Sequence, residues 1–210
     1  TNVIKFGNEN KSVLFVEVSD PSCPYCHIAG GKNPELNSQA GAQFKLVSNG
    51  GTYVAPVEEM KKLVDQGKAS FAWIYTPGHG SGEMGTKALF CAYEQGKFWE
   101  VHDLLMSREG YKIQNGYDID QSAVSADKVV GNDKTKSALL ADFLKSAIDP
   151  AFMKSCLDSG KYDSRLTEDT AVATSLGVQG TPGFFVNEKS FPGAYSYTDM
   201  QTTVNGALGN

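Results

Sequence analysis

Cys23-Pro24-Tyr25-Cys26, placed after the apolar run Val13-Leu14-Phe15-Val16-Glu17-Val18, is the stretch that decides the fold of this chain. An apolar run so short and so rich in β-branched residues predicts a buried strand, and the turn residues that end it allow a helix to begin at the cysteines. The N–H groups at the start of a helix favour a thiolate on the first sulfur, and a second thiol one turn later can close a disulfide with it. The stretch therefore predicts a redox-active cysteine pair.

Two other chemistries share the C-x-x-C spacing. Such pairs also bind zinc, and with His27 the stretch matches the C-x-x-C-H pattern of covalent haem attachment. Cys91 and Cys156 lack the close spacing of structural zinc ligands, and a cysteine pair between a strand and a helix favours redox chemistry. We expect no bound metal and no cofactor; a c-type cytochrome would instead be a red, covalently coloured protein.

The composition describes a globular chain with one substantial core. Of its 210 residues, 40% are hydrophobic, which suits a single domain or a domain with a large insertion. The formal net charge is -5 and the Lys and Arg residues are scattered, which argues against nucleic-acid binding and against an anionic membrane surface. No apolar stretch approaches the roughly 20 residues that span a bilayer. Thr1 opens the chain without the features of a signal peptide, so we expect any leader or anchor to precede this sequence.

The cysteine count indicates the compartment. Besides the tetrad there are only Cys91 and Cys156, and an even total of four is compatible with one active pair and one structural pair. That pattern favours an oxidising compartment. Two ordinary buried thiols are the alternative.

The expected secondary structure is mixed at both ends of the chain and helical in between. Strands are predicted over 12–19, 69–75 and 184–187, and the segment 191–193 follows the last of them after a turn. The first helix begins at the cysteine pair; others are predicted over 56–66, 83–95, 97–107, about 140–148, 150–159, 164–176 and 197–208. Residues 31–54 are rich in Gly, Asn and Ser and are interpreted as an inserted loop with a short β excursion at 44–47.

Three further segments make the pattern specific. They are Gly177-Val178-Gln179-Gly180-Thr181-Pro182, the segment 94–105 with the sequence EQGKFWEVHDLL, and the segment 156–162 with the sequence CLDSGKY. Together with the cysteine pair they resemble, over nearly the whole chain, the DsbA-like branch of the thioredoxin superfamily, the extracytoplasmic thiol-disulfide oxidoreductases. The resemblance implies an α/β thioredoxin fold, a central mixed sheet flanked by helices, over residues 1–76 and 164–210. It also implies an inserted all-helical domain over residues 77–163.

The resemblance assigns roles to the cysteines. It makes Cys23 the nucleophile and Cys26 the resolving cysteine of a redox disulfide. It also implies a structural disulfide between Cys91 and Cys156, in two helices of the inserted domain. The position of Cys23 at the helix start agrees with its role as the nucleophile, because Cys23 would meet the exposed N–H groups while Cys26 lies one turn inside the helix.

The expected substrate-binding residues are Thr181, Pro182, Pro24 and Tyr25. The family implies a cis Thr181-Pro182 bond beside the disulfide, which would leave the Thr181 backbone free to pair with an extended substrate strand. A trans proline that simply opens a strand is the alternative. The chain departs from the family in two places: the stretch 33–56 is longer, which could alter a groove that it borders, and Pro-Tyr between the cysteines is typical of glutaredoxins. Oxidising strength therefore does not follow from the fold.

Glu17 lies six residues before Cys23, where the family has an acidic residue under the active site. Strand alternation places it on the face of Val13 and Phe15. Burial there would raise its pKa and let it exchange protons with Cys26 through water. A carboxylate that reaches solvent at the end of the strand is the alternative.

Histidines give weaker signals. His27 could modulate the site as a cation that holds the Cys23 thiolate, and it could equally be a surface residue of the first helical turn. We interpret His79 as a loop residue and His102 as a member of a packed helix, and we expect neither to be a ligand.

These observations predict that the Cys23-Cys26 disulfide is donated to reduced, unfolded extracytoplasmic proteins. By resemblance, the partner that reoxidises the thiols is a membrane quinone-linked oxidase of the DsbB or vitamin K epoxide reductase type. We expect a monomer in the periplasm, in the cell envelope or secreted, and an N-terminal anchor outside this sequence is compatible with each of these locations. A thioredoxin-like or glutaredoxin-like reductase, or an isomerase, is the first alternative. A non-enzymatic chaperone or binding module is the second.

Overall fold

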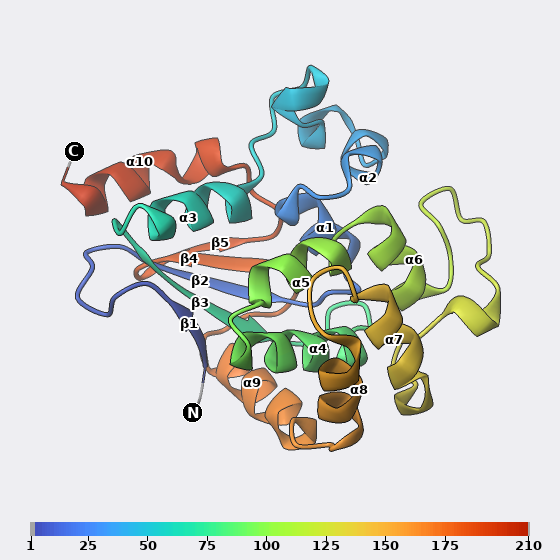
Figure 1. The fold of residues 1–210 in the computed structure, drawn as a ribbon. Helices are drawn as coiled ribbons and strands as arrows, with labels where there is room; N and C mark the ends of the chain where they lie inside the picture. The colour runs from blue at the N-terminus through green and yellow to red at the C-terminus, as the bar shows by residue number, and fades with distance from the viewer. Residues whose placement is uncertain (1–2, 210) are drawn as a thin grey trace.

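A five-stranded mixed sheet forms the centre of the computed structural model, which describes residues 3–209 (Figure 1). The strands lie in the order β1-β3-β2-β4-β5. Their bounds are Ile4–Phe6 (β1), Leu14–Ser19 (β2), Ser70–Tyr75 (β3), Gly183–Val186 (β4) and Lys189–Pro192 (β5). β2 and β3 run parallel, and the other neighbours run antiparallel. The mixed sheet confirms the expected α/β class.

Helices flank the sheet and fill the middle of the chain. Their bounds are Pro24–Gly30 (α1), Pro34–Gln39 (α2), Pro56–Asp65 (α3), Glu83–Glu94 (α4), Phe98–Leu105 (α5), Arg108–Asn115 (α6), Ser137–Phe143 (α7), Pro150–Asp158 (α8), Asp163–Ser175 (α9) and Tyr197–Leu208 (α10). Figure 1 shows α3 and α10 on one side of the sheet and α9 on the other. Within residues 3–209, none of these helices has the length and apolarity needed to cross a bilayer.

Strand β2 sits in the middle of the sheet and is covered on both faces. Phe15 packs in one core with Met60 of α3, whereas Val18 packs in another with Ala173 of α9. Because side chains alternate along a strand, Glu17 shares the face of Phe15. Ala29 of α1 belongs to the same core as Phe15, and the N–H of Asp20, just after β2, donates to Cys26 Sγ at 3.5 Å, so α1 and its second cysteine lie against this part of the sheet.

The helices α4 to α8 lie between β3 and α9 in the chain and share a core with the sheet. Leu89 of α4, Leu140 of α7 and Met153 of α8 belong to the same buried cluster as Phe15. A disulfide joins Cys91 of α4 to Cys156 of α8, with a sulfur–sulfur distance of 2.06 Å and Cα atoms 6.1 Å apart. The helical segment is therefore fastened by packing and by a covalent bond.

Several short elements differ from the sequence expectation. Strand β1 pairs antiparallel with β3 at the sheet edge, and neither it nor α2 nor α6 was expected. The helix predicted over 97–107 ends at Leu105, and Ser107 then caps α6 by accepting a hydrogen bond from the Gly110 N–H at 3.1 Å. The β excursion at 44–47 was wrong: residues 42–44 and 47–49 form 3₁₀ turns, and only an isolated bridge joins Leu46 to Tyr53.

The expected insertion is a packed layer rather than an open loop. Asn33 caps α2, and Leu36 on this helix packs with Ile28 of α1. Tyr53 joins the same small core from the end of the insertion, and Tyr111 joins it from α6. The stretch predicted as a loop thus braces the active-site helix against the helical segment.

Candidate active site

Cys23 occupies the N-cap position of α1, with Pro24 in its first turn. Proline suits this place because its ring fixes φ near the helical value, and a first-turn N–H would have no partner within the helix. The Cys23 side chain is 4% exposed. In its thiol form, Sγ donates to the Thr181 carbonyl oxygen at 3.3 Å. Because Cys26 is fully buried, the first sulfur lies on the outer side of the pair, between the helix start and the segment before β4, and this outer side is called the mouth of the site.

The two thiols differ in acidity. A hydrogen bond from the Cys26 thiol lowers the pKa of Cys23 to about 7; burial opposes this, while Thr181 and two N–H groups of α1 add to it. Cys26 is fully buried, and this burial raises its pKa well above the ordinary value. The neighbouring Cys23 raises it further. Cys23 is therefore the sulfur that ionises near neutral pH, and Cys26 remains a thiol.

The four residues expected to bind substrate are gathered around Cys23. The Thr181–Pro182 peptide is cis, and a groove of about 410 Å³ runs along residues 177–183 and β5. Next to Pro24, the Tyr25 side chain is 51% exposed, and its ring meets Phe44 of the insertion edge to face, with 5.9 Å between the centroids. A glycine-containing groove at Thr181, whose carbonyl oxygen contacts Cys23 Sγ, and an exposed aromatic ring next to the cysteines are therefore both part of the site.

Glu17 is completely buried in the middle of β2. Within the described residues, neither of its carboxyl oxygens has a hydrogen-bond partner, and burial raises its pKa. Its strand neighbours are Trp73 on β3 and Phe184 on β4. The alternative that this carboxylate reaches solvent is wrong, because both neighbouring strands and the helices above enclose it.

His27 is buried rather than exposed. Its Nδ1 lies 2.8 Å from the Met106 carbonyl oxygen and its Nε2 lies 2.7 Å from the Pro21 carbonyl oxygen. Burial lowers the pKa of His27 to about 4, so at neutral pH the ring is uncharged and donates to one of these two oxygens. Both interpretations of His27, as a surface residue and as a cation for the thiolate, are therefore corrected. It links α1 to the segment after α5.

Asp20 is a site residue that the sequence interpretation missed. This buried carboxylate accepts from the Ser22 N–H and hydroxyl, both at 2.8 Å, and from the N–H groups of Gly78 and His79 at 2.8 and 3.0 Å. A Cβ at Gly78 would lie 1.7 Å from Thr181 Oγ1, so this close approach requires glycine. Asp20 thus ties the turn before the cysteines to the loop that contacts Thr181.

Replacing Asp20 by alanine should destabilise the protein by about 3 kcal/mol, because hydrogen bonds to charged groups contribute roughly 1.5–3 kcal/mol each and several buried donors lose their acceptor. Urea denaturation measures the difference. Asp142→Ala is the matched control, since Asp142 is largely exposed and, among residues 3–209, its side chain pairs with Lys145 alone; its effect should stay within about 0.5 kcal/mol. Equal stability of Asp20→Ala and wild type would show that Asp20 does not stabilise the link between the turn before the cysteines and the loop at Gly78.

Two residues of the helical segment also reach the site. Met106 forms a buried cluster with Cys23 and Cys26, and the Tyr111 ring meets His27 edge to face, with 5.1 Å between centroids. No local sequence pattern identifies these contacts, because they depend on how the helical segment docks on α1. His102, which we interpreted as a member of a packed helix, is indeed buried. His79 is an exposed loop residue, as expected, and its Nε2 lies 2.7 Å from the Tyr117 hydroxyl.

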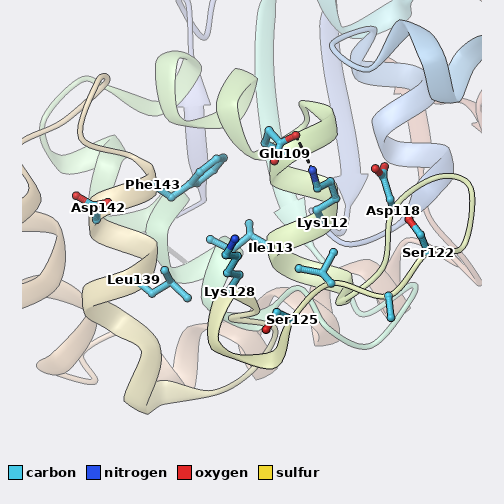
Figure 2. A pocket seen from close by; sticks show the side chains of 12 residues that line it. Glu109, Lys112, Ile113, Asp118, Ser122, Ser125, Lys128, Leu139, Asp142 and Phe143 are labelled. Carbon is cyan, nitrogen blue, oxygen red and sulfur yellow. Dashed lines mark hydrogen bonds and ion pairs between the residues drawn. The ribbon is translucent and has the colours of Figure 1, made fainter.

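A separate cavity of about 520 Å³ lies between α6, the loop that follows it, and α7 (Figure 2). Lys112 on its wall pairs with Glu109 at 2.8 Å, and Asp118 pairs with Arg108 at 2.9 Å. It contains neither redox cysteine. Across residues 3–209, no group of three or more His, Cys, Asp and Glu side chains is arranged to hold a metal ion.

Comparison with known families identifies this arrangement. The family model described as "Thioredoxin" matches residues 54–206. The chain belongs to the thioredoxin family. A similar thioredoxin-fold structure is that of BdbD from Bacillus subtilis in oxidised form, which has a TM-score of 0.64 and 20% identity, covering 99% of this chain and 94% of that one. Another is the thiol-disulfide exchange protein alpha-DsbA2 from Wolbachia pipientis, with a TM-score of 0.62 and 18% identity, covering 97% of this chain and 86% of that one.

Curated relatives of this thioredoxin-family chain are of two kinds. Disulfide bond formation protein D of Bacillus subtilis is 23% identical over 209 residues, covering 96% of this chain and 75% of the relative. The Na(+)/H(+) antiporter NhaA 3 of Salinispora tropica is 25% identical over 205 residues, covering 96% of this chain and 24% of the antiporter. The chain thus spans about a quarter of the antiporter's length. The expected resemblance to DsbA-like thiol-disulfide oxidoreductases is confirmed at the level of family and fold.

Proposed function

We propose that this chain is a thiol-disulfide oxidoreductase that donates its Cys23-Cys26 disulfide to reduced proteins. The observation that carries the proposal is the difference between the two sulfurs: Cys23 lies at the mouth with a pKa of about 7, and Cys26 is enclosed with a raised pKa. A substrate thiolate attacks Cys23 Sγ, the disulfide opens, and Cys26 leaves and takes up a proton. A second substrate thiolate then attacks the substrate sulfur of the mixed disulfide and releases the Cys23 thiolate.

The direction of the reaction follows from the stabilised thiolate. A low pKa for Cys23 favours the dithiol form over the disulfide, which makes the disulfide form an oxidant. The second disulfide, between Cys91 and Cys156, supports a location in an oxidising, extracytoplasmic compartment. We infer that a membrane quinone-linked oxidase of the DsbB or vitamin K epoxide reductase type restores the Cys23-Cys26 disulfide.

Unfolded chains are the proposed substrates. Four of the ten residues that line the groove beside Thr181 are glycines, and small side chains let an extended chain approach main-chain groups closely. Such recognition tolerates many sequences. The exposed Tyr25 ring, two residues after Cys23, offers an apolar contact for substrate side chains.

Two measurements test the proposal. The oxidised protein should refold a reduced, disulfide-containing model substrate and lose one disulfide per disulfide transferred. Its redox potential, measured by equilibration with glutathione, should lie above the thioredoxin value of about -270 mV. A potential near that value together with reduction of substrates would favour the reductase alternative, and a Cys23-Cys26 disulfide inert to dithiothreitol would favour a non-enzymatic binding module.

We also propose that Glu17 exchanges a proton with Cys26. Replacing Glu17 by glutamine should therefore slow closure of Cys26 on a mixed disulfide by about 100-fold, within the usual range for general acid–base groups. Mixing the reduced protein with glutathione disulfide and quenching in acid measures this step. Glu168→Gln, on the exposed face of α9, is the matched control and should leave the rate unchanged. A wild-type rate in Glu17→Gln would remove Glu17 from the reaction.

The same variant tests burial through stability. Because burial raises the pKa of Glu17 above its ordinary value of 4.5, the unfolded chain releases this proton at a lower pH than the folded protein does. Its contribution to wild-type stability is therefore lost as the pH rises above about 4.5 and towards the folded pKa. Urea denaturation between pH 4 and pH 8 should show Glu17→Gln gaining on wild type as the pH rises.

A further inference from the structure

Cys26 must lose its thiol proton when its sulfur forms the disulfide with Cys23. Cys26 is fully buried, and its side towards the mouth is occupied by Cys23. When Cys23 carries a substrate, that substrate covers the mouth. A proton that leaves Cys26 at this stage therefore needs a way out through the interior.

Buried polar groups lead away from Cys26 beneath α1. Ser19 and Glu17 lie on the same face of β2 and are both fully buried. The Ser19 hydroxyl is close enough to lower the pKa of both the Cys26 thiol and the Glu17 carboxyl. The Ser19 hydroxyl has no hydrogen-bond partner among the described residues, so its proton is free to orient either way.

His102 continues the series from the opposite wall. It lies on α5, it is 1% exposed, and its Nε2 has no hydrogen-bond partner among residues 3–209. Its ring is close enough to Glu17 to act on that carboxyl electrostatically. A Cβ added to Gly30 would lie 3.8 Å from His102 Cε1, so the imidazole ring packs under the last turn of α1. Glu17, Ser19 and His102 thus each hold a buried polar atom without a partner among the described residues, and buried waters typically satisfy such atoms with about three hydrogen bonds each.

The other ring nitrogen of His102 faces outward. Nδ1 lies 3.1 Å from Asp103 Oδ1, and the Asp103 side chain is 46% exposed. Lys32 pairs with Asp103 at 3.0 Å and with Glu58 of α3 at 2.8 Å. These charges lie at the C-terminal end of α1, whereas Cys23 caps its N-terminal end. The path therefore reaches solvent at the end of the helix remote from the substrate.

We propose that His102 and Asp103 form the outlet of a proton path that runs from Cys26 through Ser19 and Glu17. The proposal rests on the proposed function of the Cys23-Cys26 pair. In the closing step, Cys26 loses its proton to Glu17 by way of Ser19 and its sulfur attacks Cys23 Sγ. The Cys23–Cys26 bond forms, the bond from Cys23 to the substrate sulfur breaks, and the electron pair leaves on that sulfur as a thiolate.

The proton then passes from Glu17 to His102 and out at Asp103. The same path runs in reverse when a substrate thiolate opens the disulfide and Cys26 takes up a proton. His102 acts through Glu17 and is thus a positioning and relay residue rather than a catalytic one. Among residues 3–209, Glu17 on β2 and His27 on α1 interact electrostatically with it, and Asp103 on its own helix bonds to its Nδ1. Lys32 after α1 pairs with Asp103 and with Glu58 of α3.

The test follows the closing step directly. Reduced wild type and the variants His102→Phe, His102→Gln and Asp103→Asn are mixed with glutathione disulfide between pH 5 and pH 9, in water and in deuterium oxide. Acid quenching and mass spectrometry follow the mixed disulfide of Cys23 with glutathione. Val101→Ala is the control, because Val101 is a fully buried neighbour on α5 and takes no part in the path.

Formation of the mixed disulfide should be unchanged in every variant, since Cys23 alone carries out that step. Its closure should slow about tenfold or more at pH 7 in both His102 variants, because neither replacement can take up and release a proton, and its pH midpoint should rise. Asp103→Asn should slow closure less, and Val101→Ala should close at the wild-type rate even though it is less stable.

Closure at the wild-type rate in His102→Gln across the pH range would overturn the path. So would a loss in Val101→Ala as large as in the His102 variants, because that result would mean that α5 acts only through packing. If His102→Phe does not fold, His102→Gln and Asp103→Asn still decide the matter. Failure of wild-type Cys23 to form any mixed disulfide would instead contradict the proposed function itself.

Discussion

Replacing Cys23 by serine should abolish thiol-disulfide exchange, with a loss of at least about a thousandfold. A serine hydroxyl does not ionise near neutral pH, whereas the Cys26 thiol and the Thr181 segment hold the pKa of Cys23 at about 7. Catalysed refolding of a reduced model substrate measures the loss. Cys26→Ala is the informative partner variant, because it leaves the attacking sulfur in place and should accumulate mixed disulfides with substrates.

Alkylation of the reduced protein separates the two sulfurs. Cys23 should react alone at low reagent concentration, with a midpoint near pH 7. Because the hydrogen bond from Cys26 is the largest cause of the lowered pKa, the midpoint should move to higher pH in Cys26→Ala. Preferential alkylation of Cys26, or exchange catalysed by Cys23→Ser, would reverse the assigned roles.

Elements with strong local signals could be predicted from the sequence. Strand β2 and helix α1 were recognisable because an apolar, β-branched run is followed by turn residues and by a proline at the helix start. The α/β class and the DsbA-like resemblance followed from these elements and from the segment before β4. Burial of Glu17 was predictable for the same reason, since alternation in a central strand fixes its face.

Elements whose existence depends on tertiary contacts were missed. Strand β1 has three residues and forms only because β3 offers it an edge. Helix α2 has six residues, too few to be stable alone, and relies on its Asn33 cap and on the packing of Leu36. Helix α6 did carry readable signals, a serine cap at Ser107 and a glycine stop at Gly116.

Contacts between distant segments also determine the parts of the active site that could not be predicted from the sequence. Asp20 precedes the cysteines, but two of its donors belong to Gly78 and His79, far along the chain. His27 looks exposed when only its own helix is considered, and it is buried because the segment carrying Met106 covers it. Such contacts arise only when the helical segment docks, so no local pattern encodes them.

Removing the disulfide between α4 and α8 should give the largest stability loss outside the active site. Cys91 and Cys156 are 65 residues apart, and for a loop of this length the chain-entropy relation gives about 4 kcal/mol. In a protein of this size, such a loss lowers the melting temperature by about 10 °C. The measurement compares Cys91→Ala/Cys156→Ala with its parent, both in a Cys23→Ala/Cys26→Ala background so that only one disulfide is at stake.

Noncovalent contacts at the same junction set the limit of this effect. Glu94 at the end of α4 pairs with Lys161 at 2.6 Å and also bonds to the Tyr162 hydroxyl, so α4 remains held to the segment after α8 when the sulfurs are gone. These groups are partly exposed, and each such pair contributes up to about 1 kcal/mol. The variant should therefore fold, with its structure intact around Glu94 but with a lower urea midpoint. Equal midpoints for the variant and its parent would show that the bridge does not stabilise the helical segment.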